Sequence, residues 1–397
     1  MSIFVAILGL AFLILVHEAG HFYTARAVRM RPRRFYLGFP PAVAKTKRNG
    51  IEYGVGAIPL GGYVKIPGMH RPAPGDVDVY FGRALERSPE LVGPVQRLKR
   101  ALADENEESA KAALEELEHV GGDREDMQRG LQEISDGLAP DAYWRQPTWK
   151  RVLVIVAGPA TNLFLAVVLF ACLFLVGGGK ATTTVNSVLP NRPAAAIGLQ
   201  PGDQILTING NTVTPTEIAE RISASHGQPI TLVVRRGTGT VTLGPARPRP
   251  IDGAYRLGFV LRGERLGVGE SAWQSVKLTA IVTREIAKSL GRLVHGQGRK
   301  DISSPVGISQ TLAKSSQQGV EDYLWVLGLI SLSLALMNML PLLPLDGGHI
   351  AFSLVEGIRG RAVAREVYER VSVVGILIVA LLFFIGISND VGRLGGS

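Results

Sequence analysis

Cysteine is almost missing from this chain: Cys172 is the only one among 397 residues, which excludes an internal disulfide framework. Charged residues are missing from several long apolar runs, although the chain carries a net charge of +9. No basic residue precedes the first run and no small-residue cleavage pattern follows it, which argues against a secretory signal peptide. A hydrophobic content of 46% and a mean hydropathy of +0.19 therefore predict a membrane protein with one or more soluble parts.

Four apolar segments approach the length of about 20 residues that a transmembrane helix needs. They are residues 1–25, 152–176, 324–345 and 371–387. Arginine and lysine cluster after the first segment, before the second, and between the third and fourth. Because basic residues favour the cytoplasmic side, we expect a multi-pass protein of the cell membrane with both termini outside. Residues from about 177 to 323 would then be extracytoplasmic.

The most informative motif is His17-Glu18-Ala19-Gly20-His21, at the end of an uncharged apolar run. Helical periodicity places His17 and His21 one turn apart on one face, where two neutral imidazoles can share one tetrahedral cation. Glu18 is then placed to take a proton from an attacking water. A buried histidine pair satisfied by hydrogen bonds is the alternative. However, three ionisable groups in a membrane-length helix are costly unless a metal or water receives them.

A second polar group is expected at the same depth. Counted from outside, His17 lies roughly 22 Å along its helix, in the cytoplasmic third of the membrane. The third segment runs in the same direction, and its end contains two prolines and a glycine pair around Asp346, which must break the helix. Asp346 therefore predicts a third metal ligand with a fourth position left for water, or else only a helix-end group. His349 is a weaker candidate and is expected at the membrane interface.

Three motifs together resemble the site-2 protease family of intramembrane zinc metalloproteases, in particular its bacterial branch that cuts anti-sigma factors. They are HEAGH at 17–21, GPATN at 158–162 and NMLPLLPLDGG at 338–348. The resemblance implies that Zn2+ is held by His17, His21 and Asp346, with Glu18 as the base. It also implies that Asn162 and Asn338 contact the substrate or its reacting carbonyl. Alternatively, Asn162 caps carbonyl groups that a bend at Gly158-Pro159 would free.

Residues 51–66 read as two short strands around Pro59 and look like the membrane-associated β-hairpin of this family. A helical substrate hides its peptide bonds, so it must be extended before cleavage. An edge strand around Gly61, Gly62, Tyr63 and Val64 could hold the extended segment by strand addition, with the glycines permitting close approach. A purely structural hairpin is the alternative.

The remaining segments complete the expected domain order. Within a cytoplasmic region at 26–151, residues 70–141 are charged and alanine-rich, which predicts a helical insertion of unreadable role. Residues 180–262 alternate strand-like runs with turns, and AAAIGLQPGDQILTINGNTV resembles a PDZ core with a peptide groove. Amphipathic helices on the outer membrane surface are expected at 263–323. A cytoplasmic loop is expected at 346–370.

These observations predict a polytopic α-helical membrane protein with four transmembrane helices, a membrane-associated β-hairpin and an extracytoplasmic α/β PDZ domain. The resemblance implies an intramembrane zinc endopeptidase whose substrate is a single-pass membrane protein, typically an anti-sigma factor already shortened outside in regulated intramembrane proteolysis.

Three other functions stay open at this point: clearance of signal-peptide remnants by the same chemistry, a metal-binding PDZ scaffold, and a metal transporter. The intact Glu18 argues against a scaffold, and the near absence of ionisable groups elsewhere in the spans argues against a transporter. Expected partners are the lipid bilayer, the transmembrane substrate, and a peptide or substrate ectodomain at the PDZ domain. No nucleic acid is expected.

Overall fold

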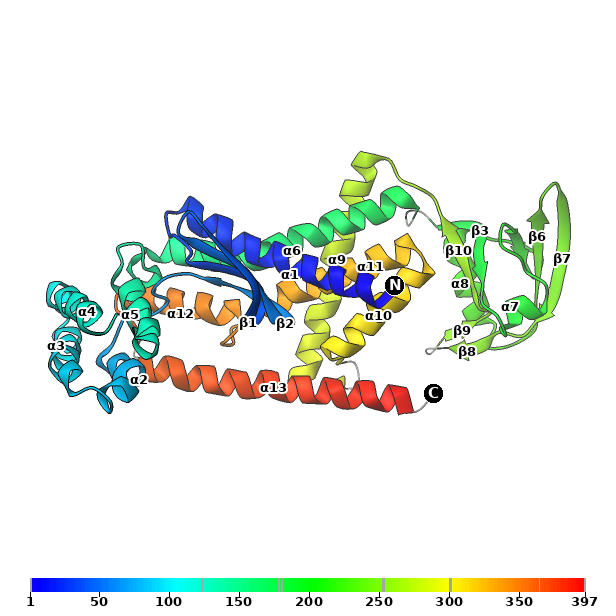
Figure 1. The fold of residues 1–397 in the computed structure, drawn as a ribbon. Coiled ribbons are helices and arrows are strands. Elements are labelled where there is room, and N and C mark those ends of the chain that lie inside the picture. Colours follow the sequence, from blue (N-terminus) through cyan, green and yellow to red (C-terminus); the bar gives the residue numbers. More distant parts are fainter. Residues whose placement is uncertain are drawn as a thin grey trace. The chain divides into compact units, whose positions relative to one another are not determined.

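The computed structural model describes residues 2–122, 124–177, 179, 181–251, 254–299, 302–363 and 365–395. The chain divides into two compact units. Residues 1–165, 286–313 and 330–397 form the first unit, and residues 166–285 and 314–329 form the second. Figure 1 shows that long helices dominate the chain, with strands confined to the N-terminal hairpin and to the region between α6 and α9.

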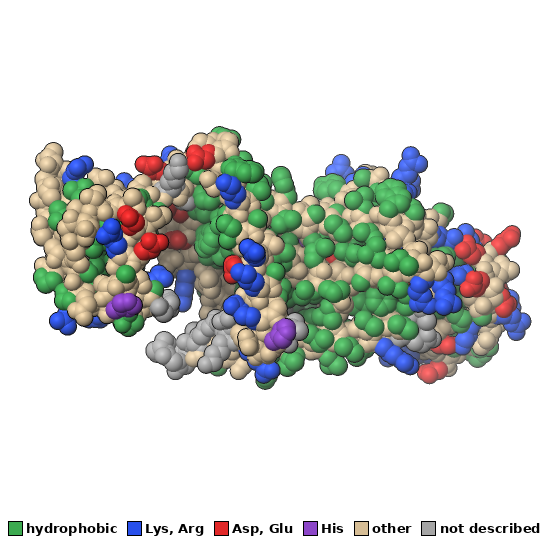
Figure 2. All heavy atoms as spheres, turned by 180° about the vertical axis from the view of Figure 1, so that it is seen from behind, with side chains coloured by type: hydrophobic (Ala, Val, Ile, Leu, Met, Phe, Trp, Pro, Cys, Tyr) green, Lys and Arg blue, Asp and Glu red, His purple; other side chains and the backbone are tan. Residues whose placement is uncertain are grey.

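Among the described residues, four helices are long and apolar enough to cross a membrane, which confirms the four predicted spans. They are α1 (Ser2–Ala27), α6 (Thr148–Val176), α11 (Val320–Asn338) and α13 (Arg365–Gly395). Large apolar side chains on them are exposed, and Phe384 of α13 has 69% of its surface uncovered. Figure 2 shows hydrophobic side chains gathered over one face of this helical region. In water such a surface would be unfavourable, so it fits contact with lipid tails. The protein is therefore a multi-pass membrane protein.

The third span and the segment after it differ from the prediction. Helix α11 ends at Asn338, before the prolines, and α12 occupies Asp346–Arg359. The predicted loop at 346–370 is therefore wrong for most of its length. Gly347 and Gly348 seemed to mark a turn, but they lie in the first turn of α12, where added Cβ atoms would collide with the backbone of residues 339–343. The glycines allow close packing of the helix start against the preceding loop.

Helix α13 lies against that loop but is the least buried of the four spans. Only 11% of its apolar window is buried, compared with 28% to 39% for the other three. A Cβ atom at Gly375 would collide with the carbonyl oxygen of Leu343, so α13 touches the interruption between α11 and α12 at this point.

The hairpin is larger than predicted. Strand β1 (Arg34–Arg48) pairs with β2 (Ile51–Lys65) around an Asn49-Gly50 turn, in which both residues have positive φ angles. The predicted hairpin within 51–66 is thus one strand of a longer one. The partner was missed because Pro40 and Pro41 interrupt β1 in the sequence and are unfavourable in most strands.

Each strand bends back on itself, so that the last part of β2 forms an additional edge of the sheet. Residues 34–37 pair with residues 52–55 and also with residues 62–65. Among the described strands no other segment pairs with residues 62–65, which therefore present one free edge. Figure 1 shows this sheet beside α1.

The charged insertion forms four helices with their own apolar core. They are α2 (Pro74–Leu85), α3 (Val92–Ala103), α4 (Glu107–Gly121) and α5 (Glu125–Leu138). Phe81, Leu98, Leu117 and Met127 are fully buried in this core. Burying these side chains gives the bundle its own source of stability.

The second unit contains a sheet in the order β10-β3-β4-β6-β7, as expected for the PDZ-like domain. Its elements are β3 (Ala181–Val188), α7 (Pro193–Ala196), β4 (Gln204–Ile208), β5 (Asn211–Thr212), α8 (Pro215–Ala224), β6 (Ile230–Arg236), β7 (Gly239–Ala246) and β10 (Phe259–Gly263). A short ribbon follows β7 and consists of β8 (Arg249–Ile251) and β9 (Ala254–Arg256). Asp203 is buried, and Arg236 donates to both its carboxylate oxygens at 2.8 and 2.7 Å. The two expected surface helices are α9 (Val268–Val294) and α10 (Pro305–Gln318).

Candidate metal centre

Two helices bring three ligand groups together. His17 and His21 lie one turn apart on α1, and their Nε2 atoms are 3.3 Å apart. Oδ2 of Asp346, the first residue of α12, lies 3.1 Å from His17 Nε2 and 3.4 Å from His21 Nε2. Both imidazoles are buried. Within the described part of the chain, this is the one group of three such residues close enough to hold a metal ion.

The hydrogen bonds around these groups test whether they fit zinc. His21 Nδ1 lies 2.8 Å from the carbonyl oxygen of Val154, so it carries a proton and leaves the Nε2 lone pair free. Nε2 then points at a second imidazole nitrogen and at Asp346 Oδ2, a buried oxygen without a hydrogen-bond partner. Acceptors crowded together in this way repel one another unless a cation sits among them. Two imidazole nitrogens and one carboxylate oxygen match a catalytic zinc site with an open position.

Close contact between α1 and α6 holds His21 in place. A Cβ atom at Gly158 would collide with the His21 imidazole, and one at Gly20 would collide with the carbonyl oxygen of Ala157. The hydroxyl of Thr161 donates to the carbonyl of Val16 at 3.1 Å, across the same contact. Small residues thus let the two backbones approach closely, as is common between transmembrane helices. Gly158, the first residue of GPATN, therefore leaves the space that the His21 imidazole occupies. The sequence did not reveal this role.

Asn162 lies behind His17 rather than in the cavity. It is completely buried, and its side-chain nitrogen is 3.4 Å from His17 Nδ1. Its backbone carbonyl accepts a hydrogen bond from Ser331 of α11 at 2.8 Å. An amide can present either its oxygen or its nitrogen to a ring atom, and its oxygen would hold a proton on His17 Nδ1 and free Nε2 for metal. The position thus favours orientation of a ligand over direct contact with substrate.

A cavity of about 550 Å3 opens beside the ligand groups. Glu18, Asn338 and the edge segment 61–64 line it together with the three ligands. His349 also lines this cavity, and its Nδ1 lies 2.6 Å from the hydroxyl of Tyr368 on α13. His349 thus lies beside the candidate metal centre, and its position at the membrane interface stays a prediction. Its spacing of three residues from Asp346 was the available signal, because α12 places both residues on one helical face.

The edge strand reaches the proposed base directly. Glu18 and Val64 line the same cavity. A Cβ atom at Gly62 would lie 2.9 Å from Glu18 Cγ and 3.1 Å from Ile14 Cγ2, closer than side chains normally pack. On its other side, Tyr63 stacks on Tyr36 with ring centroids 5.2 Å apart. The absence of a side chain at Gly62 therefore lets the strand approach α1 at Glu18.

Comparison with known proteins agrees with this site. The model of peptidase family M50 matches residues 5–382. The zinc metalloprotease RasP of Geobacillus kaustophilus is 31% identical over 408 residues, covering 96% of this chain and 95% of that protein. The regulator of sigma-W protease RasP of Bacillus subtilis is 29% identical, covering 96% of each chain. The probable protease eep of Enterococcus faecalis is 26% identical, covering 98% of each.

The class of protein follows from the site and its surroundings: zinc ligands and an adjacent glutamate, carried by helices of membrane-spanning length, define an intramembrane zinc metalloprotease. More particularly, the chain belongs to peptidase family M50, the site-2 protease family that its three motifs resemble.

The contact of Gly158 with His21 gives a first prediction. Gly158→Ala should displace the imidazole and lower zinc affinity by about 10- to 100-fold, the usual effect of disturbing groups that orient a metal ligand. Competition with a chelator on the purified protein measures this affinity. Gly291→Ala in α9, where an added Cβ meets nothing within 4 Å, is the matched control and should bind zinc normally. Unchanged zinc affinity in Gly158→Ala would contradict the role of this contact.

Proposed function

We propose that this protease cleaves the transmembrane segment of single-pass membrane proteins, and that its typical substrate is an anti-sigma factor already shortened outside the cell by another protease. The observation that carries the proposal is the meeting of three elements in one cavity: the His-His-Asp donor set, Glu18 and a free strand edge. The regulator of sigma-W protease of Bacillus subtilis, similar over 96% of each chain, supports a regulatory substrate.

The chemistry is divided among a few side chains. Zinc, when held by His17, His21 and Asp346, supplies a Lewis acid for the scissile carbonyl and for the attacking water. Glu18 accepts the proton of that water and donates it to the leaving amine. Asn338 lines the cavity and can contact the substrate carbonyl. Asn162, which lies behind His17, contributes by orienting this imidazole.

The edge strand is proposed to hold the substrate in an extended form. Residues 62–65 are paired on one side, and the segment 61–64 lines the cavity. The carbonyl of Lys65 accepts a hydrogen bond from Arg33, on the paired side of the strand. Because successive residues of a strand alternate in direction, the N–H groups of Val64 and Gly62 face the free edge. An unwound substrate segment added along this edge would therefore lie next to the proposed zinc ligands.

The orientation in the membrane is proposed from charge. With the arginine-rich connections in the cytoplasm, both termini and the PDZ-like domain are outside, and the zinc site lies toward the cytoplasmic side. The PDZ-like domain is then placed to meet the outer part of a substrate or a peptide. Clearance of signal-peptide remnants uses the same chemistry and is the second candidate function, which a substrate comparison separates from the first.

The base and the ligands give a second prediction. Glu18→Gln should retain stoichiometric zinc and lower cleavage of a reconstituted single-pass substrate by about 100- to 10,000-fold, since it removes only proton transfer. Asp346→Asn should also weaken zinc binding, because it removes a charged ligand. Metal analysis and a cleavage assay on both variants measure these effects. Near-normal proteolysis by Glu18→Gln would contradict the assigned mechanism.

A third prediction concerns the strand edge. Val64→Pro removes a backbone donor that faces the cavity, and each lost hydrogen bond is worth about 0.5–1.5 kcal/mol before distortion is added. Cleavage should therefore fall tenfold or more while zinc content is maintained. Val64→Ala keeps the N–H group and serves as the control. If the folded, zinc-loaded proline variant is fully active, the hairpin has only a structural role.

A fourth prediction tests the orientation. In a variant whose Cys172 is replaced by serine, a cysteine introduced at Ser225 should react with an impermeant thiol reagent applied to intact cells. A cysteine introduced at Asn106, in the exposed turn before α4, should react only after the membrane is opened. The opposite labelling pattern would invert the orientation.

A further inference from the structure

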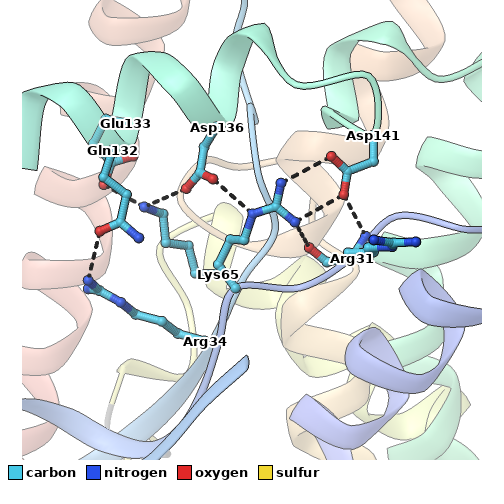
Figure 3. Close-up of polar contacts among 8 residues, drawn as sticks. Arg31, Arg34, Lys65, Gln132, Glu133, Asp136 and Asp141 are labelled. Carbon is cyan, nitrogen blue, oxygen red and sulfur yellow. Dashed lines mark hydrogen bonds and ion pairs between the residues drawn. The ribbon is translucent and has the colours of Figure 1, made fainter. Parts of the chain in front are cut away.

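Lys65 ties the edge strand to the helical insertion. It directly follows Val64, and its Nζ lies 2.9 Å from Glu133 Oε1 and 3.0 Å from Asp136 Oδ2. Both acids belong to α5, the last helix of the insertion. Figure 3 shows Lys65 reaching these two carboxylates from the end of β2. The residue next to the proposed substrate edge is therefore held by a helix outside the membrane-spanning region.

The neighbouring strand is anchored at the same place. Arg33 donates from Nε to Asp136 at 2.8 Å and from its two terminal nitrogens to Asp141, at 3.0 Å each. Its backbone N–H donates to the carbonyl oxygen of Lys65 at 2.7 Å. The backbone N–H of Arg31 also donates to Asp141, at 3.1 Å (Figure 3). Asp136 thus contacts both Arg33 and Lys65. One network therefore holds the start of β1 and the end of β2.

The charged side chains of this network are partly shielded from water. Burial acts to raise the pKa of Asp141, but the hydrogen bonds and the positive charge of Arg33, together with backbone N–H groups, outweigh burial and lower it. The side chains of Lys65 and Asp136 are only 15% and 9% exposed. Removing one partner of such a pair leaves a poorly solvated charge, which perturbs structure far more than breaking an exposed pair. The Lys99–Asp78 pair, within the same insertion, is 36% and 58% exposed and provides that contrast.

The bundle has an apolar core of its own. Its apolar core is formed by side chains of α2–α5 and the short turn before α3, and none of the charged residues of the network belongs to that core. The strand edge, in contrast, is short and paired on one side only. The contact therefore contributes more order to the strand than to the insertion.

We propose that the insertion formed by α2–α5 positions the edge strand, with Glu133 and Asp136 acting through Lys65 as positioning residues for the segment 61–64 beside Glu18. The inference deepens the proposed function and rests on it for the effect on cleavage. The order of the strand can be measured without any substrate.

The test compares full-length, zinc-loaded variants in lipid nanodiscs. Glu133→Gln combined with Asp136→Asn removes both charges that hold Lys65, and Asp78→Asn is the matched control elsewhere in the insertion. Hydrogen–deuterium exchange of peptides covering residues 61–66 reports strand order, metal analysis reports zinc, and cleavage of a single-pass substrate is expressed per bound zinc.

We expect the double variant to exchange at least tenfold faster at 61–66, to keep one zinc per chain, and to lose at least tenfold in turnover per zinc. Asp78→Asn should match the wild type in all three measurements. Lys65→Met should resemble the double variant, and Lys65→Arg, which keeps the charge, should recover most of the activity.

Three outcomes separate the alternatives. Unchanged exchange at 61–66 in the double variant would overturn the proposal. Faster exchange with normal turnover per zinc would also overturn it, because loss of order in the strand would then have no effect on the reaction. If the wild-type protein cuts no membrane segment, the proposed function fails, and the exchange result alone decides whether the insertion orders the strand.

Discussion

The structure depends on holding three groups that repel one another at a single point between apolar helices. The two Nε2 atoms and Asp346 Oδ2 all lie within 3.4 Å of one another, which is stable only when a cation is shared among them. The surrounding contacts follow from this requirement. Val154 fixes the proton of one imidazole, Asn162 lies behind the other, and Gly158 makes room for the first.

A second constraint is that a transmembrane substrate keeps its peptide bonds inside its own helix. The strand edge that lines the same cavity as Glu18 is proposed to meet this constraint. A loose two-stranded hairpin is only marginally stable by itself, so its order must come from contacts elsewhere. The aromatic stack of Tyr63 on Tyr36 provides one such contact, and the ionic network at Lys65 provides another.

Local sequence patterns were sufficient to predict the residues of the metal site. Pairings between segments far apart in the sequence could not be predicted in this way. His17 and His21 lie one helical turn apart, and Asp346 could be expected at their depth because both segments are predicted to cross the membrane in the same direction. The partner strand of residues 51–65 was hidden by Pro40 and Pro41, and helix α12 by its paired glycines. The network around Asp136 lay beyond any pattern, since Arg33 and Asp136 are 103 positions apart and both resemble ordinary surface charges in the sequence.

The uneven burial of the four spans has a consequence for how a substrate helix reaches the cavity. Helix α13 buries the smallest share of its apolar window of the four spans, so it has the least packing to lose when it separates from its neighbours. It carries none of the three proposed zinc ligands. It meets the site through Gly375, which packs on the loop before α12, and through Tyr368, which contacts His349 and His70. A lateral entrance beside α13 would therefore leave the metal-binding groups assembled while the membrane side of the cavity opens.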